Sequence, residues 1–404
     1  MRRQYLGALL LASTALGIAA ACGPGFLDGL TGGSADGGGP VTEDDAGEIC
    51  DPLVAPTRPT GDGPPGPEIY FAFEQIKIDT NAPADGGLEP PQGLDLDGLC
   101  TCHPSARACM PASANGDPDA GEPQCDPDGG RGRDDALGEL FNALIATVQE
   151  AKTDFATERI RLGQFTIMVD VRGWNGSDND QSVDVTLLGS QLLDRVDGGR
   201  AAAPLFDGTD TWTIDPLSLF EGESKLGRDC RIDVSFCNAT PGRIAAGQSG
   251  NAYVKDGVLV AKFRSAPFVI GTNIGDLLYD AEEPTLVARI SKDGSGRTRL
   301  AGEVAGRWRT DKALAAISPL NFPDTRTGML VPLCTQPSFY GVVKQAVCSL
   351  ADLPLTPDLP STTLCQTLSA SIAFSAGEVQ RPSFVVRRSD GGGPCASFQD
   401  DCVP

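Results

Sequence analysis

The stretch QFTIMVDVRGWNGSDNDQSVDVTLLG, residues 164–189, decides the fold that the sequence predicts. In each half of it, apolar residues alternate with mostly polar ones, a period of two that is typical of a β-strand with one buried face. The apolar positions are Phe165, Ile167, Val169 and Val171 in the first half and Val183, Val185 and Leu187 in the second. Between the halves, Asn175-Gly176 supplies residues that accept positive φ, as a hairpin connection requires. We therefore expect two antiparallel strands joined by a polar loop.

Further short strands are expected on both sides of this hairpin. Before it, Ile69, Phe71, Phe73, Ile76 and Ile78 alternate with one slip, which indicates a bulge. After it, Gly or Asp turns separate five β-like runs, which are residues 252–255, 258–263, 268–270, 286–290 and 299–308. Short strands at this spacing, without helices between them, favour an antiparallel arrangement. The predicted fold class is mainly β with packed helices (α+β), an antiparallel β-sandwich or barrel-like domain stapled by disulfides.

Two helices are expected to pack against the strands, near residues 135–152 and 338–350. Asp134 and Asp135 precede the first helix, where negative charge favours a helix N-terminus. Each helix carries one apolar stripe at helical spacing. The stripes are Leu137, Leu140, Phe141, Leu144, Ile145 and Val148 in the first, and Phe339, Val342, Val343, Ala346, Val347 and Leu350 in the second.

The first 22 residues have the layout of an export signal. Two arginines precede the apolar run Leu6–Ala21, which is shorter than the ~20 residues that span a bilayer, and the run leads directly into Cys22. This pattern resembles the lipobox of bacterial lipoproteins, in which the thiol of the Cys takes a diacylglycerol and the preceding peptide is removed. That family usually has Leu three residues before the Cys, where this chain has Ala19.

The resemblance implies a signal peptide over residues 1–21 and a lipid anchor on Cys22. Asp after the Cys often retains such lipoproteins at the inner membrane, and Gly23 lacks that mark, so the outer membrane of a Gram-negative envelope is implied. Ordinary signal peptidase could instead cut after Ala21 and release a soluble, secreted protein. Residues 22–67, rich in Gly, Pro and Asp, predict a disordered tether, and residues 68–404 predict a single domain.

Net charge and cysteine count narrow the class of protein. A formal charge of −22 argues against nucleic acid and against an anionic membrane surface as partners. The chain has 13 Cys, and setting Cys22 aside leaves an even number, which predicts up to six disulfides in an oxidising compartment. Local pairs are expected between Cys230 and Cys237 and between Cys395 and Cys402. The groups that remain are odd in number, so at least one bridge should join the N-terminal segment to the C-terminal helical region.

Few residues offer a site for chemistry. His103 is the only histidine, so any mechanism that needs a histidine base must use it, and no catalytic residue or cofactor is predicted. A structural calcium ion is the better-motivated ligand, because Asp126 and Asp128 stand beside a Gly turn and are followed by Asp134. Weaker versions of this pattern are Asp95-Leu-Asp97-Gly98 and Asp178-Asn-Asp180. A zinc or copper site at Cys100, Cys102, His103 and Cys109 is a further alternative, in competition with disulfides.

The function that these features favour is a binding or structural role, with an envelope protein or a polysaccharide as the kind of partner. The alternative is a carbohydrate-active β-sandwich that uses two paired carboxylates. A cleft in which carboxylates converge beside Trp174, Trp212 or Trp308 would favour that enzyme.

Overall fold

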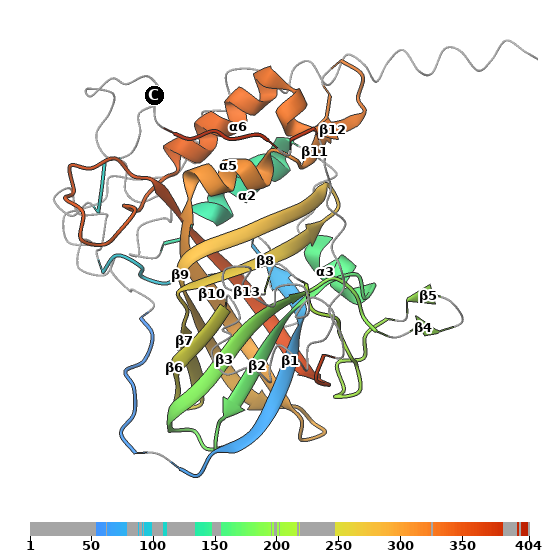
Figure 1. Cartoon of the computed structure of the whole chain (residues 1–404), viewed down its shortest axis with the longest axis vertical. Helices are drawn as coiled ribbons and strands as arrows, with labels where there is room; N and C mark the ends of the chain where they lie inside the picture. The colour runs from blue at the N-terminus through green and yellow to red at the C-terminus, as the bar shows by residue number, and fades with distance from the viewer. Residues whose placement is uncertain are drawn as a thin grey trace, which may run out of the picture.

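The computed structural model of the chain describes residues 54–61, 63–78, 88, 91, 93–98, 108–110, 134–147, 155–194, 196–197, 200–201, 203–215, 218, 247–324, 326–382, 394–395 and 397–402. They form an antiparallel β-barrel with helices packed against it (Figure 1). Eight strands make the closed ring and follow one another in chain order. They are β1 (Gly66–Lys77), β2 (Thr166–Gly173), β3 (Asp180–Ser190), β6 (Gly247–Lys255), β7 (Val258–Lys262), β9 (Gly275–Lys292), β10 (Thr298–Arg309) and β13 (Thr367–Val379). Of the two predicted β architectures, the barrel is the one observed.

The ring closes where β13 lies between β1 and β10, while β10 pairs on its other side with β9. An additional strand, β8 (Ser265–Thr272), pairs with the first half of β9. Between its two pairings β9 passes Glu283, which has a positive φ of 49°. Gly306 of β10 lies against this point, because a Cβ there would come within 2.9 Å of the Cα of Pro284. Glycine therefore allows the close backbone approach at this corner.

The hairpin predicted from residues 164–189 is confirmed. β2 and β3 pair without a register shift, from Thr166 opposite Ser190 to Arg172 opposite Asp184. The predicted slip in β1 is also present, as a register shift between Phe73 and Gln75. Four of the five later β-like runs fall within β6, β8, β9 and β10, and the fifth, 258–263, extends one residue past the end of β7.

Apolar side chains line the inside of the barrel. The alternation of the strands places their apolar residues on one shared face, and these residues form a single core cluster. Phe73 of β1 and Phe374 of β13 stack on this face with their ring centroids 4.0 Å apart. The opposite, outward face carries most of the polar strand residues, such as Asp170, Glu303 and Arg307.

The predicted helices form at the expected places. α2 (Ala136–Thr147) and α6 (Pro337–Ser349) bury the centres of their stripes, with Leu140 and Val343 fully covered. Residues 148–152 of the first prediction lie outside the described residues. The other elements are α3 (Phe155–Arg161), α5 (Thr310–Ile317), the 3-10 turn η3 (Leu333–Thr335) and two small ribbons, β4 (Val196–Asp197) with β5 (Arg200–Ala201) and β11 (Asn321–Pro323) with β12 (Leu330–Pro332).

Three disulfides staple the described part of the chain: Cys109–Cys365, Cys334–Cys395 and Cys348–Cys402. The first confirms the expected bridge between the N-terminal segment and the C-terminal region. The expected local pair Cys395–Cys402 is wrong. These two cysteines stand seven residues apart in a segment that lies along α6, where Phe398 packs edge-on against Tyr340. Cys334 stands in η3 just before α6 and Cys348 in the last turn of α6, so the segment that lies along the helix brings Cys395 and Cys402 to opposite ends of it and each bridges there.

The folded domain begins before Glu68, the boundary expected from the sequence. β1 starts at Gly66, and the residues ahead of it already contact the barrel. Arg58 donates a hydrogen bond to Asn251 Oδ1 at 2.7 Å, and the hydroxyl of Tyr253 donates to the carbonyl of Pro56. The last part of the expected tether, from residue 54, is thus laid along β6.

The first prediction concerns α2. Leu144 is 6% exposed, so Leu144→Asp should place a carboxylate in the core and lower the free energy of unfolding by several kcal/mol. Asn142→Asp is the matched control, since it adds the same charge at a half-buried position of the same helix and should cost far less. Denaturant melts of both variants check this, and equal midpoints would mean that α2 does not contribute to the core.

Candidate functional site

The sequence-predicted site residues fall into two groups. Cys22, Cys100, Cys102, His103, Asp126, Asp128, Cys230 and Cys237 lie outside the described residues. Asp134 lies inside them, 1% exposed, directly before α2. The pattern Asp178-Asn-Asp180 also lies inside them, and Asp180 Oδ2 accepts the N–H of Asn175 at 2.7 Å within the β2–β3 loop. Its carboxylate therefore has a structural role in the hairpin.

A cluster of three carboxylates joins Asp134 to the weaker sequence signal at Asp95 and Asp97. One ligand oxygen from each lies within 4.8 Å of the others. Asp134 holds the loop in place, because its Oδ2 accepts the N–H of Leu96 at 2.6 Å. Gly93, with φ of +73°, lets the loop approach, since a Cβ there would lie 2.9 Å from the carbonyl oxygen of Asp134. The sequence pointed to Asp134 and to Asp95 with Asp97 as separate candidates. That they lie together could not be predicted, because it depends on the tertiary fold.

The chemistry of the cluster is that of hard oxygen ligands, which suit Ca²⁺. A positive group also stands close by, since Arg307 Nη2 donates to the carbonyl of Leu96 at 2.7 Å. Arg307 is 6% exposed and so carries its charge into the wall beneath the loop. The predicted calcium site therefore stays a prediction, now with Asp95, Asp97 and Asp134 as its described members.

A second group of carboxylates lies where α2 begins. Asp135 caps the helix, since its Oδ1 accepts the N–H of Gly138 at 3.2 Å and also that of Ser371 at 3.1 Å. The hydroxyl of Ser371 donates in turn to Glu303 at 3.0 Å. Burial raises the pKa of Asp135 well above its usual value, and the negative charges of Glu303 and Asp352 act in the same direction. This group ties α2 to the outward face of β10 and β13.

A third group lies on the outward face of β1 and β2. Arg172 bridges Glu68 at 2.7 Å and Asp170 at 2.5 Å. Burial raises the pKa of Asp170 to about 6, against the opposing effect of Arg172. The pKa of Tyr70 is also raised, first by burial and then by the charge of Asp170. The four groups form a compact polar network in the barrel wall.

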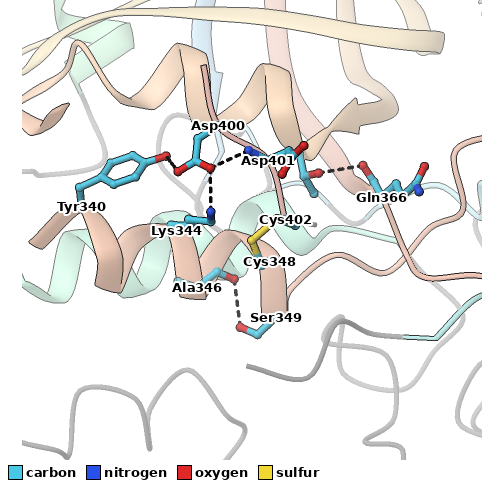
Figure 2. Close-up of a disulfide and its surroundings, with 10 residues drawn as sticks. Tyr340, Lys344, Ala346, Cys348, Ser349, Gln366, Asp400, Asp401 and Cys402 are labelled. Carbon is cyan, nitrogen blue, oxygen red and sulfur yellow. Dashed lines mark hydrogen bonds and ion pairs between the residues drawn. A yellow bond between two sulfur atoms is a disulfide. The ribbon is translucent and has the colours of Figure 1, made fainter. Parts of the chain in front are cut away.

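A small pocket of about 150 Å³ lies near the C-terminal end of the chain. Arg309 and Asp311, an ion pair at 2.9 Å, line it together with Leu355 and Cys402. Figure 2 shows the neighbouring Cys348–Cys402 disulfide. In the same view Asp400 lies between Tyr340 Oη at 2.9 Å and Lys344 Nζ at 2.7 Å. These contacts fix the C-terminal segment on α6, so the walls of the pocket are covalently held.

The three tryptophans do not line this pocket or either carboxylate cluster. Trp212 and Trp308 are fully buried and Trp174 is 8% exposed, and all three belong to the core cluster. The indole N–H of Trp174 donates to the carbonyl of Ser177 at 2.9 Å within the hairpin. In the described part of the chain, none of these tryptophans therefore lines a cleft with converging carboxylates, the arrangement that would favour a carbohydrate-active enzyme.

The second prediction tests the loop that Asp134 holds. Asp134→Ala should leave the N–H of Leu96 without its acceptor and lower the free energy of unfolding by about 1–3 kcal/mol, measured by denaturant melts with a chelator present. Asp95→Ala is the control, because it removes only a turn contact to Gly98 and should cost less. Repeating the melts with excess calcium tests the predicted ion, which would raise the Tm of the wild type and not that of Asp97→Asn.

The third prediction follows from the raised pKa of Asp170. Unfolded, this carboxyl titrates near pH 4, and folded it titrates at about 6, so the folded protein binds the proton more tightly between these values. Its contribution to stability is therefore present at low pH and is lost as the pH rises through 6. Asp170→Asn should remove this loss. The variant-minus-wild-type difference in unfolding free energy should rise by up to about 3 kcal/mol from pH 4 to pH 7, and a flat difference would contradict the shift.

Comparison of the chain with protein-family models, curated proteins and solved structures finds no match. The barrel fold alone does not indicate a function, since such folds host many unrelated functions. Within the described residues, no helix is both long enough and apolar enough to cross a membrane.

Proposed function

We propose that this protein is an exported lipoprotein of a Gram-negative envelope, anchored to the outer membrane through acylated Cys22, with a binding or structural role. The observation that carries the proposal is the N-terminal pattern of arginines, apolar run and small residues that ends at Cys22. Three disulfides support it, because such bridges persist in oxidising compartments. The Cys left after Cys22 is set aside remain even in number.

The barrel supports a binding or structural role through its outer surface. Its core residues form one apolar cluster, with Phe73 and Phe374 stacked inside the ring, which favours contact with a partner through the outer surface. A partner such as an envelope protein or a polysaccharide would then be met by loops, helices and outward strand faces. The C-terminal disulfides support the same view, since they keep the helical end of the barrel rigid.

The fourth prediction tests the anchor. Cys22→Ser should release the mature protein from the membrane fraction, because the acylated thiol is lost. Gly23→Asp is a matched control, since it keeps the thiol and should move the protein to the inner membrane without releasing it. Mass spectrometry of the mature N-terminal peptide provides the direct measurement. An unmodified N-terminus in the wild type would refute the anchor and favour the secreted alternative.

A further inference from the structure

One outward face of the barrel is basic although the chain is acidic. In the pairing of β6, β7 and β9, Lys255 lies opposite Val258, which lies opposite Arg289. Lys262 is on the same face of β7 as Val258, further along the strand. Their neighbours along the strands, Val254, Leu259, Ala261 and Ala288, are at most 1% exposed and belong to the core cluster. The cations therefore point away from the barrel. We call Arg58, Lys255, Lys262 and Arg289 the basic wall.

Two of the four charges of the basic wall, those of Lys262 and Arg289, are uncompensated. Lys262 and Arg289 are exposed, and within the described residues neither has a carboxylate partner. Lys255 pairs with Asp256 at 2.9 Å. Arg58 contacts neutral groups, namely Asn251 and the ring of Tyr253, whose centroid lies 5.0 Å from the guanidinium carbon. Exposed carboxylates flank the β6 side of the wall, with Asp178 beside Gly257 and Asp184 on the neighbouring strand β3. The unpaired positive charge of this face is therefore concentrated at Lys262 and Arg289, on a chain of net charge −22.

The chain enters the folded domain along the β6 side of this wall. Residues 54–61 run beside β6, as the contacts of Pro56 and Arg58 with Tyr253 show (Figure 1). Only 31 residues, 23–53, separate the wall from Cys22. A lipid on Cys22 would therefore hold the domain to the membrane by the end of the chain that lies on the basic wall.

We propose that the basic wall rests on the anionic lipid headgroups of the membrane that holds Cys22, which orients the barrel. This inference rests on the proposed lipid anchor. The overall negative charge does not prevent it, because charges more than about 8–10 Å from the headgroups are largely screened at physiological salt. Each Lys or Arg near an anionic bilayer strengthens its binding roughly fivefold, so a few unpaired cations on one face suffice to choose an orientation.

Chemical modification of the acylated, full-length mature protein tests the orientation. In vesicles that contain phosphatidylglycerol, an amine-acetylating reagent should modify Lys262 several-fold more slowly than in vesicles of phosphatidylcholine alone, and high salt should abolish the difference. Lys344 on α6 is the internal reference and should react equally in both. If the protein floats with both vesicles and Lys262 reacts equally, the orientation is wrong. If it floats with neither, the anchor itself is absent and the inference fails with it.

Charge substitution in the unacylated Cys22→Ser chain isolates the wall from the anchor. Lys262→Gln with Arg289→Gln should lower partition onto phosphatidylglycerol vesicles at low salt by more than tenfold, at roughly fivefold for each cation. Arg161→Gln with Arg326→Gln changes the net charge equally at exposed residues of α3 and the β11–β12 turn, and should leave partition unchanged. Equal losses in both double variants would overturn the proposal. Binding of the wall to a soluble anionic polysaccharide but not to vesicles would overturn it in favour of that partner.

Discussion

The pairing of β1 with β13 is the constraint on which the rest of the structure depends. It joins the first strand of the ring to the last, with Tyr70 opposite Val379 at one end and Lys77 opposite Ala373 at the other. The two strands lie far apart in the sequence, and contacts between such distant segments are entropically costly. The Cys109–Cys365 bridge has a sequence separation of 256 and closes a loop of similar size. In the chain-entropy account a bridge over so long a loop contributes about 5 kcal/mol, which offsets part of that cost.

Barrel closure also decides where polar groups can go. Because the inner face is occupied by a single apolar cluster, most charged strand side chains point outward, where they need polar partners. On β10 and β13 such partners come from α2, whose N-terminal N–H at Ala136 donates to Ser369 Oγ at 2.7 Å. On β1 and β2 the charged groups are paired by strand side chains alone, with Arg172 between the carboxylates of Glu68 and Asp170. The raised pKa values of Asp135 and Asp170 are thus consequences of closing the ring beneath them.

Local pattern sufficed to predict the strands and helices, because each is decided by residues close together in the chain. The alternation at Phe165–Val171, the slip before Gln75 and the stripe through Leu140 all describe one buried face, and burial on one face is what the barrel requires. The Asp256-Gly257 turn between β6 and β7, with both φ values positive, belongs to the same class of local signal. Barrel closure could not be predicted in this way, since either a sandwich or a barrel satisfies the alternation.

What the sequence could not predict are the pairs that only the closed chain brings together. Cys395 and Cys402 look like a local bridge because they are near in sequence, but packing along α6 aligns each with a different, more distant cysteine. Asp134 was predicted to act with Asp126 and Asp128, which lie outside the described residues, and among the described residues it meets Asp95 and Asp97. In the sequence the tryptophans are candidates for stacking on sugars. In the structure they are buried in the core, because large rings fill a barrel well.

The outward surface of the barrel divides into two kinds of face, and this division follows from how each face is covered. Where β10 and β13 meet α2, the charged and polar groups Glu303, Arg307 and Ser371 are covered and contribute to cohesion within the domain. Where residues 54–61 lie against β6, Lys262 and Arg289 on the next strands β7 and β9 stay in solvent. Exposed cations without a carboxylate partner do not stabilise the domain. Their charge acts on the molecules that approach this surface. Because the entering chain lies on this face, a tether at the N-terminus would bring that face, before any other, to the surface that holds it.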